Sequence, residues 1–177
     1  MKQIDAVEYL PHIMKELRKG ILLSTKNGDK YNAMTIGWAQ AGVEWGKMFF
    51  TVYVRHGRFT HKQIEATKEF TINVPLDRES AAKAVAYCGS RNGEKIDKFA
   101  DCGLTIVDGV SVKSPAIKEL PLTIECKVIY QQEQMPSNMP SDVLASCYPQ
   151  DVSSDNPMAN RDFHTVYYGE IVNAYIL

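Results

Sequence analysis

The chain has 177 residues, a formal net charge of −1 and a sequence pI near 6.4. This length predicts one domain, residues 1–177, with a substantial core. Because nucleic acids and anionic membranes attract proteins with an excess of Lys and Arg, the charge balance disfavours both as partners.

The cysteines and histidines give no metal signature. The four cysteines form neither a Cys-x-x-Cys pair nor a zinc-type pattern, and His56, His61 and His164 share no metal-ligand spacing with carboxylates. No signal-peptide segment follows Met1, and no apolar run approaches the roughly 20 residues that span a bilayer. We therefore expect a cytoplasmic protein without a bound metal or membrane segment.

The first half of the chain predicts a helix and then antiparallel strands. Apolar side chains recur at helical spacing over residues 5–19, where Pro11 favours a kink or a late start and Gly20 ends the segment. The sequence Lys-Asn-Gly-Asp at 26–29 is a strong hairpin signal. Strands are expected at 21–25, 31–39 and 48–55, and a short helix at 60–67.

The second half predicts further strands around short helices. A period-two apolar face at 70–74 ends at Pro75, and the clearest half-exposed alternation runs over 122–131. The other expected elements are a helix at 80–87, a loop at 88–93 that is a second candidate for ligand contact, a helical turn at 97–102, and a strand at 166–177. Residues 132–162 are expected to be mainly loop, with a short helical turn at 142–147.

These elements favour a mainly β fold. About six or seven strands, mostly linked by hairpins and interrupted by three short helices, predict a closed or nearly closed antiparallel barrel with helical additions. A doubly wound parallel sheet would need longer crossover helices, and no Gly-x-Gly-x-x-Gly follows any strand.

An anion-binding corner is predicted where the strand at 48–55 ends. Arg55 and Arg58 are three positions apart, and Gly57 between them permits a tight turn. The Thr60-x-x-Gln63 spacing is that of a capping box, so Thr60 is expected to begin a helix whose N-terminus faces the arginines. Spacing alone leaves two solvated arginines equally plausible, but the adjoining helix start favours a phosphate site.

Together with this corner, the run Asn32-Ala33-Met34-Thr35 resembles the flavin reductase-like, FMN-binding split-barrel family, and more closely its flavoredoxin-like branch. The resemblance covers most of the chain. It implies an antiparallel, Greek-key-like split barrel that forms a homodimer and binds FMN without a covalent bond near the subunit interface.

The resemblance also implies the site. Asn32 to Thr35 would lie along the isoalloxazine ring, although alone these residues fit the start of a strand. Arg55, Arg58 and Thr60 would hold the phosphate. The other implied cofactor-binding residues are Tyr53, Val54, Phe59, Cys88, Gly89, Ser90 and Lys98. Relatives often carry a His-His or His-x-aromatic element before the last strand, whereas here Thr165 follows His164. His164 is therefore a candidate for contact with the nicotinamide or the electron acceptor.

If FMN binds, the cofactor carries the redox chemistry, and no side chain, Cys88 included, is expected to be catalytic. The implied activity is an oxidoreductase that passes electrons from NADH or NADPH through flavin to a redox protein or a small acceptor. The alternative is a non-enzymatic split-barrel module that binds flavin or haem, because fold alone does not separate the two.

Overall fold

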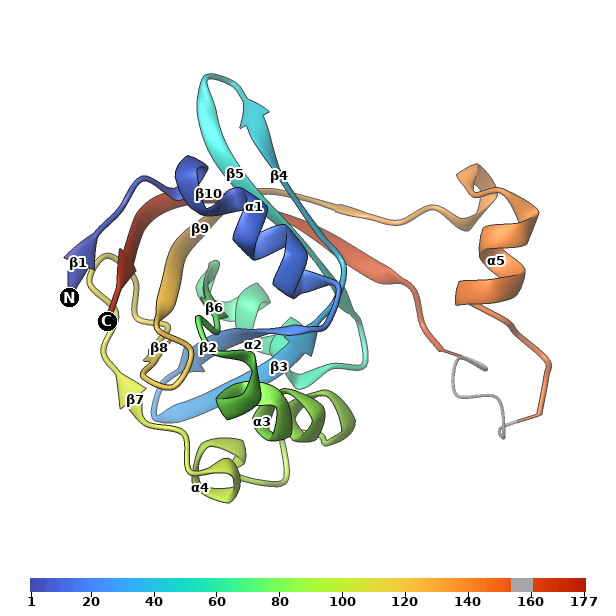
Figure 1. Ribbon diagram of the computed structural model, residues 1–177. Helices are drawn as coiled ribbons and strands as arrows, with labels where there is room; N and C mark the ends of the chain where they lie inside the picture. Colours follow the sequence, from blue (N-terminus) through green and yellow to red (C-terminus); the bar gives the residue numbers. More distant parts are fainter. Residues whose placement is uncertain (154–160) are drawn as a thin grey trace.

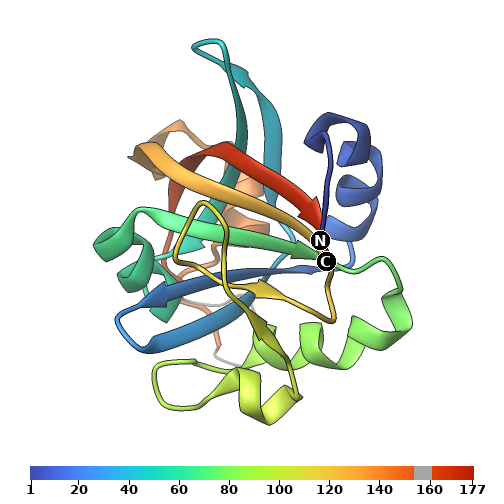
Figure 2. The same ribbon diagram turned by 90° about the vertical axis from the view of Figure 1, so that its left-hand side faces the viewer.

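A computed structural model describes residues 1–153 and 161–177, and its centre is an eight-stranded antiparallel sheet that curls into a barrel (Figures 1 and 2). The pairing order is β3-β2-β6-β9-β10-β5-β4, and β1 pairs with β10. Because β3 and β4 stand at the two ends of this order, the barrel is split between them. The predicted mainly β, antiparallel fold is confirmed.

The strands of this sheet are β1 Lys2–Gln3, β2 Ile21–Asn27, β3 Lys30–Ile36, β4 Ala39–Glu44, β5 Lys47–Arg55, β6 Glu69–Val74, β9 Leu122–Glu133 and β10 His164–Ile176. A separate two-stranded ribbon consists of β7 Ile106–Val107 and β8 Ala116–Ile117. The helices are α1 Ala6–Leu17, α2 Phe59–Thr67, α3 Arg78–Ser90, α4 Lys98–Cys102, the 3-10 helix η1 Pro136–Asn138, and α5 Ser141–Cys147. No helix within the described residues is long and apolar enough to cross a membrane.

The hairpins follow local turn chemistry. β2 and β3 are joined at Gly28, whose φ of +58° suits glycine, as the sequence predicts. The predicted extension of the second strand to Ala39 is wrong, since β3 ends at Ile36 and Ala39 begins β4. The sequence analysis missed β4 because this exposed edge strand carries few large apolar residues. Its hairpin with β5 projects beyond the barrel in Figure 1.

α1 and α3 both depart from the predicted boundaries. α1 begins directly after its N-cap Asp5 and contains Pro11 in its interior, so a late start at the proline is wrong. α3 extends to Ser90, so the predicted loop at 88–93 is wrong for its first three residues. Gly89 suits this close packing, because a Cβ there would lie 3.2 Å from Thr35 Cβ on β3.

The predicted capping box at Thr60 is also wrong. α2 begins one residue earlier with Arg58 as N-cap, and no side chain makes a capping hydrogen bond. Gln63 instead accepts from Thr25 Oγ1 at 2.5 Å and donates to the Lys30 carbonyl at 2.9 Å. The Gln63 side chain, which the local spacing assigned to the cap, is therefore engaged in tertiary hydrogen bonds with the β2–β3 hairpin.

Burial along β9 differs from the predicted half-exposed pattern. Residues 122–126 are buried on both faces of the strand, and exposure begins at Lys127. Glu125 tolerates this burial because its carboxylate accepts from the Val110 and Ser111 N–H groups at 2.6 and 2.7 Å and from Tyr175 Oη at 2.8 Å. The segment after β9 contains α5, which confirms the predicted helical turn and reaches out beyond the barrel (Figure 1). Residues 154–160 of the predicted loop lie outside the described residues.

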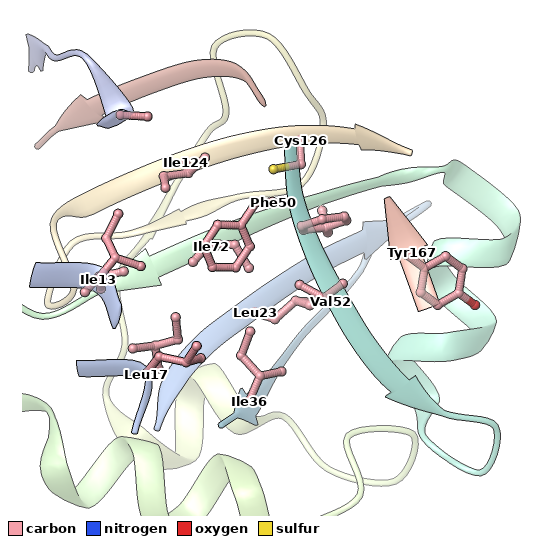
Figure 3. Close-up of a cluster of buried hydrophobic side chains, with 14 of the residues drawn as sticks. Ile13, Leu17, Leu23, Ile36, Phe50, Val52, Ile72, Ile124, Cys126 and Tyr167 are labelled. Atoms are coloured by element: carbon pink, nitrogen blue, oxygen red, sulfur yellow. The ribbon is translucent and has the colours of Figure 1, made fainter. Parts of the chain in front are cut away.

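The barrel interior is one apolar cluster, in which side chains from α1 meet those of the strands (Figure 3). Ile13 and Leu17 pack with Phe50, Ile72 and Ile124 there. A second cluster lies between β2, β3 and the helices α3 and α4. The two clusters fix β3 from both faces, which positions Asn32 to Thr35 at the split edge of the barrel.

Candidate functional site

A cleft of about 160 Å³ opens at the split edge, where β3, β5 and β10 come together. Its lining consists of Met34, Thr35, Ile36, Gly37, Trp38, Tyr53, Arg55, Arg58 and His164. A smaller pocket of about 20 Å³ shares Met34, Thr35 and Arg58 with the cleft. The further residues of this pocket are Asn32, Phe59, Thr60, Cys88, Gly89, Arg91, Asn92, Gly93 and Lys98. The two hollows thus form one continuous site.

Most of the predicted cofactor-binding residues line this site, but three do not. Ala33 and Val54 are fully buried in the two apolar clusters. Ser90 is exposed and donates to the Tyr87 carbonyl at 3.1 Å. The side chains of these three residues do not line the site, and their contact with the cofactor, which for Ala33 was expected through the backbone, stays a prediction. The carbonyl of Ala33 accepts a hydrogen bond from Lys98, and Lys98 lines the site.

Asn32 connects the two halves of the site. Its Nδ2 donates to Thr60 Oγ1 at 2.7 Å, which joins β3 to the first turn of α2. Its Oδ1 is buried and has no hydrogen-bond partner within the described residues. A Cβ on Gly93 would lie only 1.9 Å from this oxygen, so glycine permits the close approach of the 91–97 loop. A buried acceptor without a donor costs about 1–3 kcal/mol, which a ligand N–H would recover.

The two arginines of the predicted corner have different environments. Arg55 is buried, lies 5.1 Å from the Tyr148 ring centre, and donates to the carbonyl oxygens of Asp162 and Cys147. Arg58 is half-buried, and its guanidinium makes no hydrogen bond within the described part of the chain. Burial lowers the pKa of both groups, yet guanidinium remains charged at any physiological pH. Arg58 is therefore the arginine whose donors are available to a ligand.

The N-terminus of α2 adds backbone donors next to Arg58. No acceptor within the described residues takes the N–H groups of Phe59 and Thr60. The nine-residue helix directs these groups and the positive end of its dipole toward the same pocket. The structure thus brings Arg58 and the N-terminus of α2 together as expected, with Arg58 rather than Thr60 as the N-cap.

Lys98 supplies a second buried cation. Its Nζ donates to the Ala33 carbonyl at 2.8 Å and to the Cys88 carbonyl at 2.9 Å, which ties β3 to the end of α3. Desolvation lowers the pKa of this ammonium. Burial raises the pKa of the neighbouring Cys88 thiol to about 12, so the thiol stays protonated near neutral pH. This supports the prediction that Cys88 is not a nucleophile.

His164 lies at the other end of the cleft. Its Nδ1 is 2.8 Å from Tyr148 Oη and 3.1 Å from Gln134 Oε1, and its ring centre is 5.2 Å from that of Trp38. Desolvation, aided by the charge of Arg55, lowers the pKa of His164 to about 4. Near pH 7 the imidazole is therefore neutral.

Sequence reasoning missed several lining residues. Gly37 and Trp38 lie between β3 and β4, within the stretch 31–39 that was predicted as one strand, so the sequence did not mark them as lining residues. Arg91, Asn92 and Gly93 belong to the loop that the sequence marked as a second candidate for ligand contact, and the structure places this loop in the pocket. His56 and His61 share no metal-ligand spacing with a carboxylate along the chain, but the fold brings Glu133 beside both of them.

The chain is thus a split antiparallel barrel with a cationic pocket at its open edge. Residues 14–177 match the Flavin reductase like domain, and the chain belongs to this family. An uncharacterized protein of Archaeoglobus fulgidus is 32% identical over 130 residues, which cover 73% of this chain and 68% of that protein.

Among solved structures, the flavoredoxin of Desulfovibrio vulgaris (Miyazaki F) matches with a TM-score of 0.67 and 27% identity, covering 89% of this chain and 69% of the other. The flavoredoxin of Methanosarcina acetivorans matches with a TM-score of 0.65 and 25% identity, covering 89% and 68%.

The residues of the site fit a flavin nucleotide. Arg58 and the free N–H groups of α2 suit a phosphate. The orphaned Oδ1 of Asn32 suits an N–H donor, and an isoalloxazine ring carries one. Met34 and Tyr53 offer partly exposed apolar surface for an aromatic ring.

Proposed function

We propose that this protein binds FMN without a covalent bond and acts as a flavin-dependent oxidoreductase. One observation carries the proposal: the unpartnered Asn32 Oδ1, the free guanidinium of Arg58 and the N-terminus of α2 converge on one continuous pocket. Arg58, Thr60 and the first-turn N–H groups would hold the phosphate. Residues 32–35, together with Lys98, would lie beside the ring.

Bound FMN would supply hydride and single-electron transfer chemistry. The chain's own residues bind and orient the cofactor and set its electrostatic environment. Lys98 and Arg58 place positive charge around the pocket, which favours a more anionic, reduced cofactor. Neither the protonated Cys88 nor the neutral His164 is needed to form a covalent bond.

NADH or NADPH is the electron donor in this proposal. A hollow of about 700 Å³, lined in large part by apolar residues, shares Gly37, Trp38 and Tyr53 with the cleft and extends between α1 and α5. Its opening beside the cleft supports a second substrate binding next to the flavin. His164 lines the cleft, and its neutral imidazole would contact that substrate.

A homodimer and a redox-protein partner complete the proposal. Val43 and Trp45 on the β4–β5 hairpin are 70% and 60% exposed, and Met135 before α5 is 60% exposed. Large apolar side chains on projecting segments support contact with another chain. Light scattering of the purified protein tests the dimer, and a monomer at micromolar concentration would contradict it.

The first test of the function is anaerobic. The purified protein should take up one FMN per chain, and NADH or NADPH should then bleach the absorbance of the bound flavin. Bleaching by a reduced ferredoxin but by neither nicotinamide would favour exchange with a redox protein. Binding of FMN without reduction by any of these donors would favour a non-enzymatic module, and failure to bind FMN would contradict the whole proposal.

A further inference from the structure

A group of three potential metal ligands lies outside the residues that line the cleft. His56 belongs to the turn after β5, His61 to the first turns of α2, and Glu133 to the end of β9. One ligand atom from each residue lies within 4.8 Å of the other two. Three separate elements therefore bring two imidazoles and a carboxylate to one place.

The contacts show that these side chains already interact. His56 Nε2 is 2.5 Å from Glu133 Oε2, and the ring centres of His56 and His61 are 5.3 Å apart. Thr165 Oγ1 donates to Glu133 Oε1 at 2.7 Å and lies 3.0 Å from His61 Nε2. Thr165 thus orients both the carboxylate and one imidazole, as residues around metal ligands commonly do.

We propose that His56, His61 and Glu133 bind one divalent first-row transition-metal ion of the zinc class. Two imidazoles and a carboxylate form a ligand set of open zinc and non-haem iron sites, whereas Mg²⁺ and Ca²⁺ prefer oxygen ligands. Metal–ligand distances of about 2.0–2.2 Å place tetrahedral ligand atoms roughly 3.4 Å apart. The three ligand atoms, which lie within 4.8 Å of one another, would move into that range by side-chain rotation when an ion binds.

The surroundings suit a cation. Glu65 and Asp162 place negative charge near His61 in addition to that of Glu133, which favours a positive ion at this position. The His56 and Glu133 side chains are 45% and 57% exposed, which leaves room for an entering ion and for water at the open position.

Metal binding would also connect the site to the proposed FMN pocket. His56 directly follows Arg55 and lies two residues before Arg58, whereas Glu133 belongs to a strand distant in sequence. A bound ion would fasten the turn that carries both arginines to β9. Metal binding at these three residues does not require FMN to be the cofactor of the neighbouring pocket.

The test is isothermal titration of Zn²⁺ alone into tag-free protein as purified, after removal of adventitious metal with a chelator. We expect one saturable site. His56→Ala and Glu133→Gln should each weaken its zinc affinity at least about tenfold, because losing even a residue that only orients a metal ligand has an effect of that size. His12→Ala is the matched control, because His12 contacts the Pro75 carbonyl elsewhere and should leave the affinity unchanged. Mg²⁺ should give no saturable binding.

Thermal unfolding provides a second readout. Because a ligand that binds only the native state stabilises it, Zn²⁺ should raise the Tm of the wild-type protein and of His12→Ala, but not that of the double variant His56→Ala/Glu133→Gln. Circular dichroism confirms that each variant is folded before titration. Zinc affinity that is equal in wild type and double variant, or no saturable binding by folded wild type, would overturn the proposal.

Discussion

Asn32 Nδ2 donates to Thr60 Oγ1 at 2.7 Å, and the same amide leaves its Oδ1 buried without a partner within the described residues. One half of the side chain thus builds the junction of β3 and α2, while the other half has no hydrogen-bond partner there. This division separates the structural role of Asn32 from its role in binding.

Asn32→Ala should weaken FMN binding by about 1–3 kcal/mol, because the variant lacks the acceptor for a ligand N–H. The free energy of unfolding without FMN should change much less, since the substitution also removes an unsatisfied buried oxygen. Fluorescence titration with FMN and urea unfolding of the cofactor-free protein measure the two effects.

Asn73→Ala is the matched control for this prediction. Asn73 is also fully buried, but its amide donates to Ser24 Oγ at 2.9 Å and accepts from the Ile117 N–H at 2.9 Å. This substitution should lower the free energy of unfolding without a specific loss of FMN affinity. If Asn32→Ala behaves like Asn73→Ala, the Asn32 amide is structural and not part of the binding site.

Arg58→Ala should weaken FMN binding by about 1.5–3 kcal/mol, the scale of a lost charged hydrogen bond, without destabilising the domain. Arg55→Ala should instead lower the free energy of unfolding, because the carbonyl groups of Cys147 and Asp162 lose their donor. FMN titration and urea unfolding of both variants distinguish the two roles.

Lys62→Ala controls for the loss of one positive charge, because Lys62 also belongs to α2 but is exposed and paired with Glu94. Its effect on FMN affinity should be small and should vanish at high ionic strength. An FMN affinity of Arg58→Ala equal to that of Lys62→Ala would remove Arg58 from the site.

The sequence predicted the elements whose signals are local. The hairpin at Gly28, the period-two strand that ends at Arg55 and the α4 turn between Asp97 and Gly103 each depend on neighbouring residues, and all three are present. Arg58 and Thr60 were also brought to one pocket as expected. Other predictions failed because a distant partner decides the outcome.

Gln63 and Glu133 illustrate such failures. The Thr60–Gln63 spacing is compatible with a cap, but contacts with Thr25 and Lys30 determine where the Gln63 side chain lies. Glu133 is separated from His56 by 77 positions, so the pairing of β9 with β10 and of β10 with β5 creates their proximity. No spacing rule along the chain detects either contact.

Lys98→Met should destabilise the domain by roughly 2 kcal/mol, because the buried carbonyl groups of Ala33 and Cys88 lose their common donor. Relief from burying a charge offsets part of this cost, which keeps the net effect below the sum of two lost hydrogen bonds. Urea unfolding measures the difference. Lys95→Met, at an exposed position nearby, is the control, and equal stability of the two variants would show that Lys98 does not tie β3 to α3.

His164 should make the stability of the protein depend on pH. Its pKa is about 4 in the folded chain, below the ordinary value of 6.5, because desolvation and the charge of Arg55 disfavour the imidazolium. As the pH falls below 6.5 the unfolded chain takes up a proton at this position, whereas the folded chain does not. The contribution to stability is therefore fully present above pH 6.5, declines between pH 6.5 and 4, and is lost below pH 4.

The substitution His164→Asn removes this titration and keeps a side chain that can hydrogen-bond to Tyr148 or Gln134. The free energy of unfolding of the wild-type protein should fall more steeply than that of the variant as the pH decreases from 6.5 to 4.5, with a difference in slope of at most about 1.4 kcal/mol per pH unit, the value for one proton. Contributions from His61 and the carboxylates are common to both proteins and cancel in the difference. Urea unfolding at intervals across this range measures the two slopes. Parallel curves would mean that the folded chain protonates His164 as readily as the unfolded chain does, and that the cleft is more hydrated around this ring than its burial indicates.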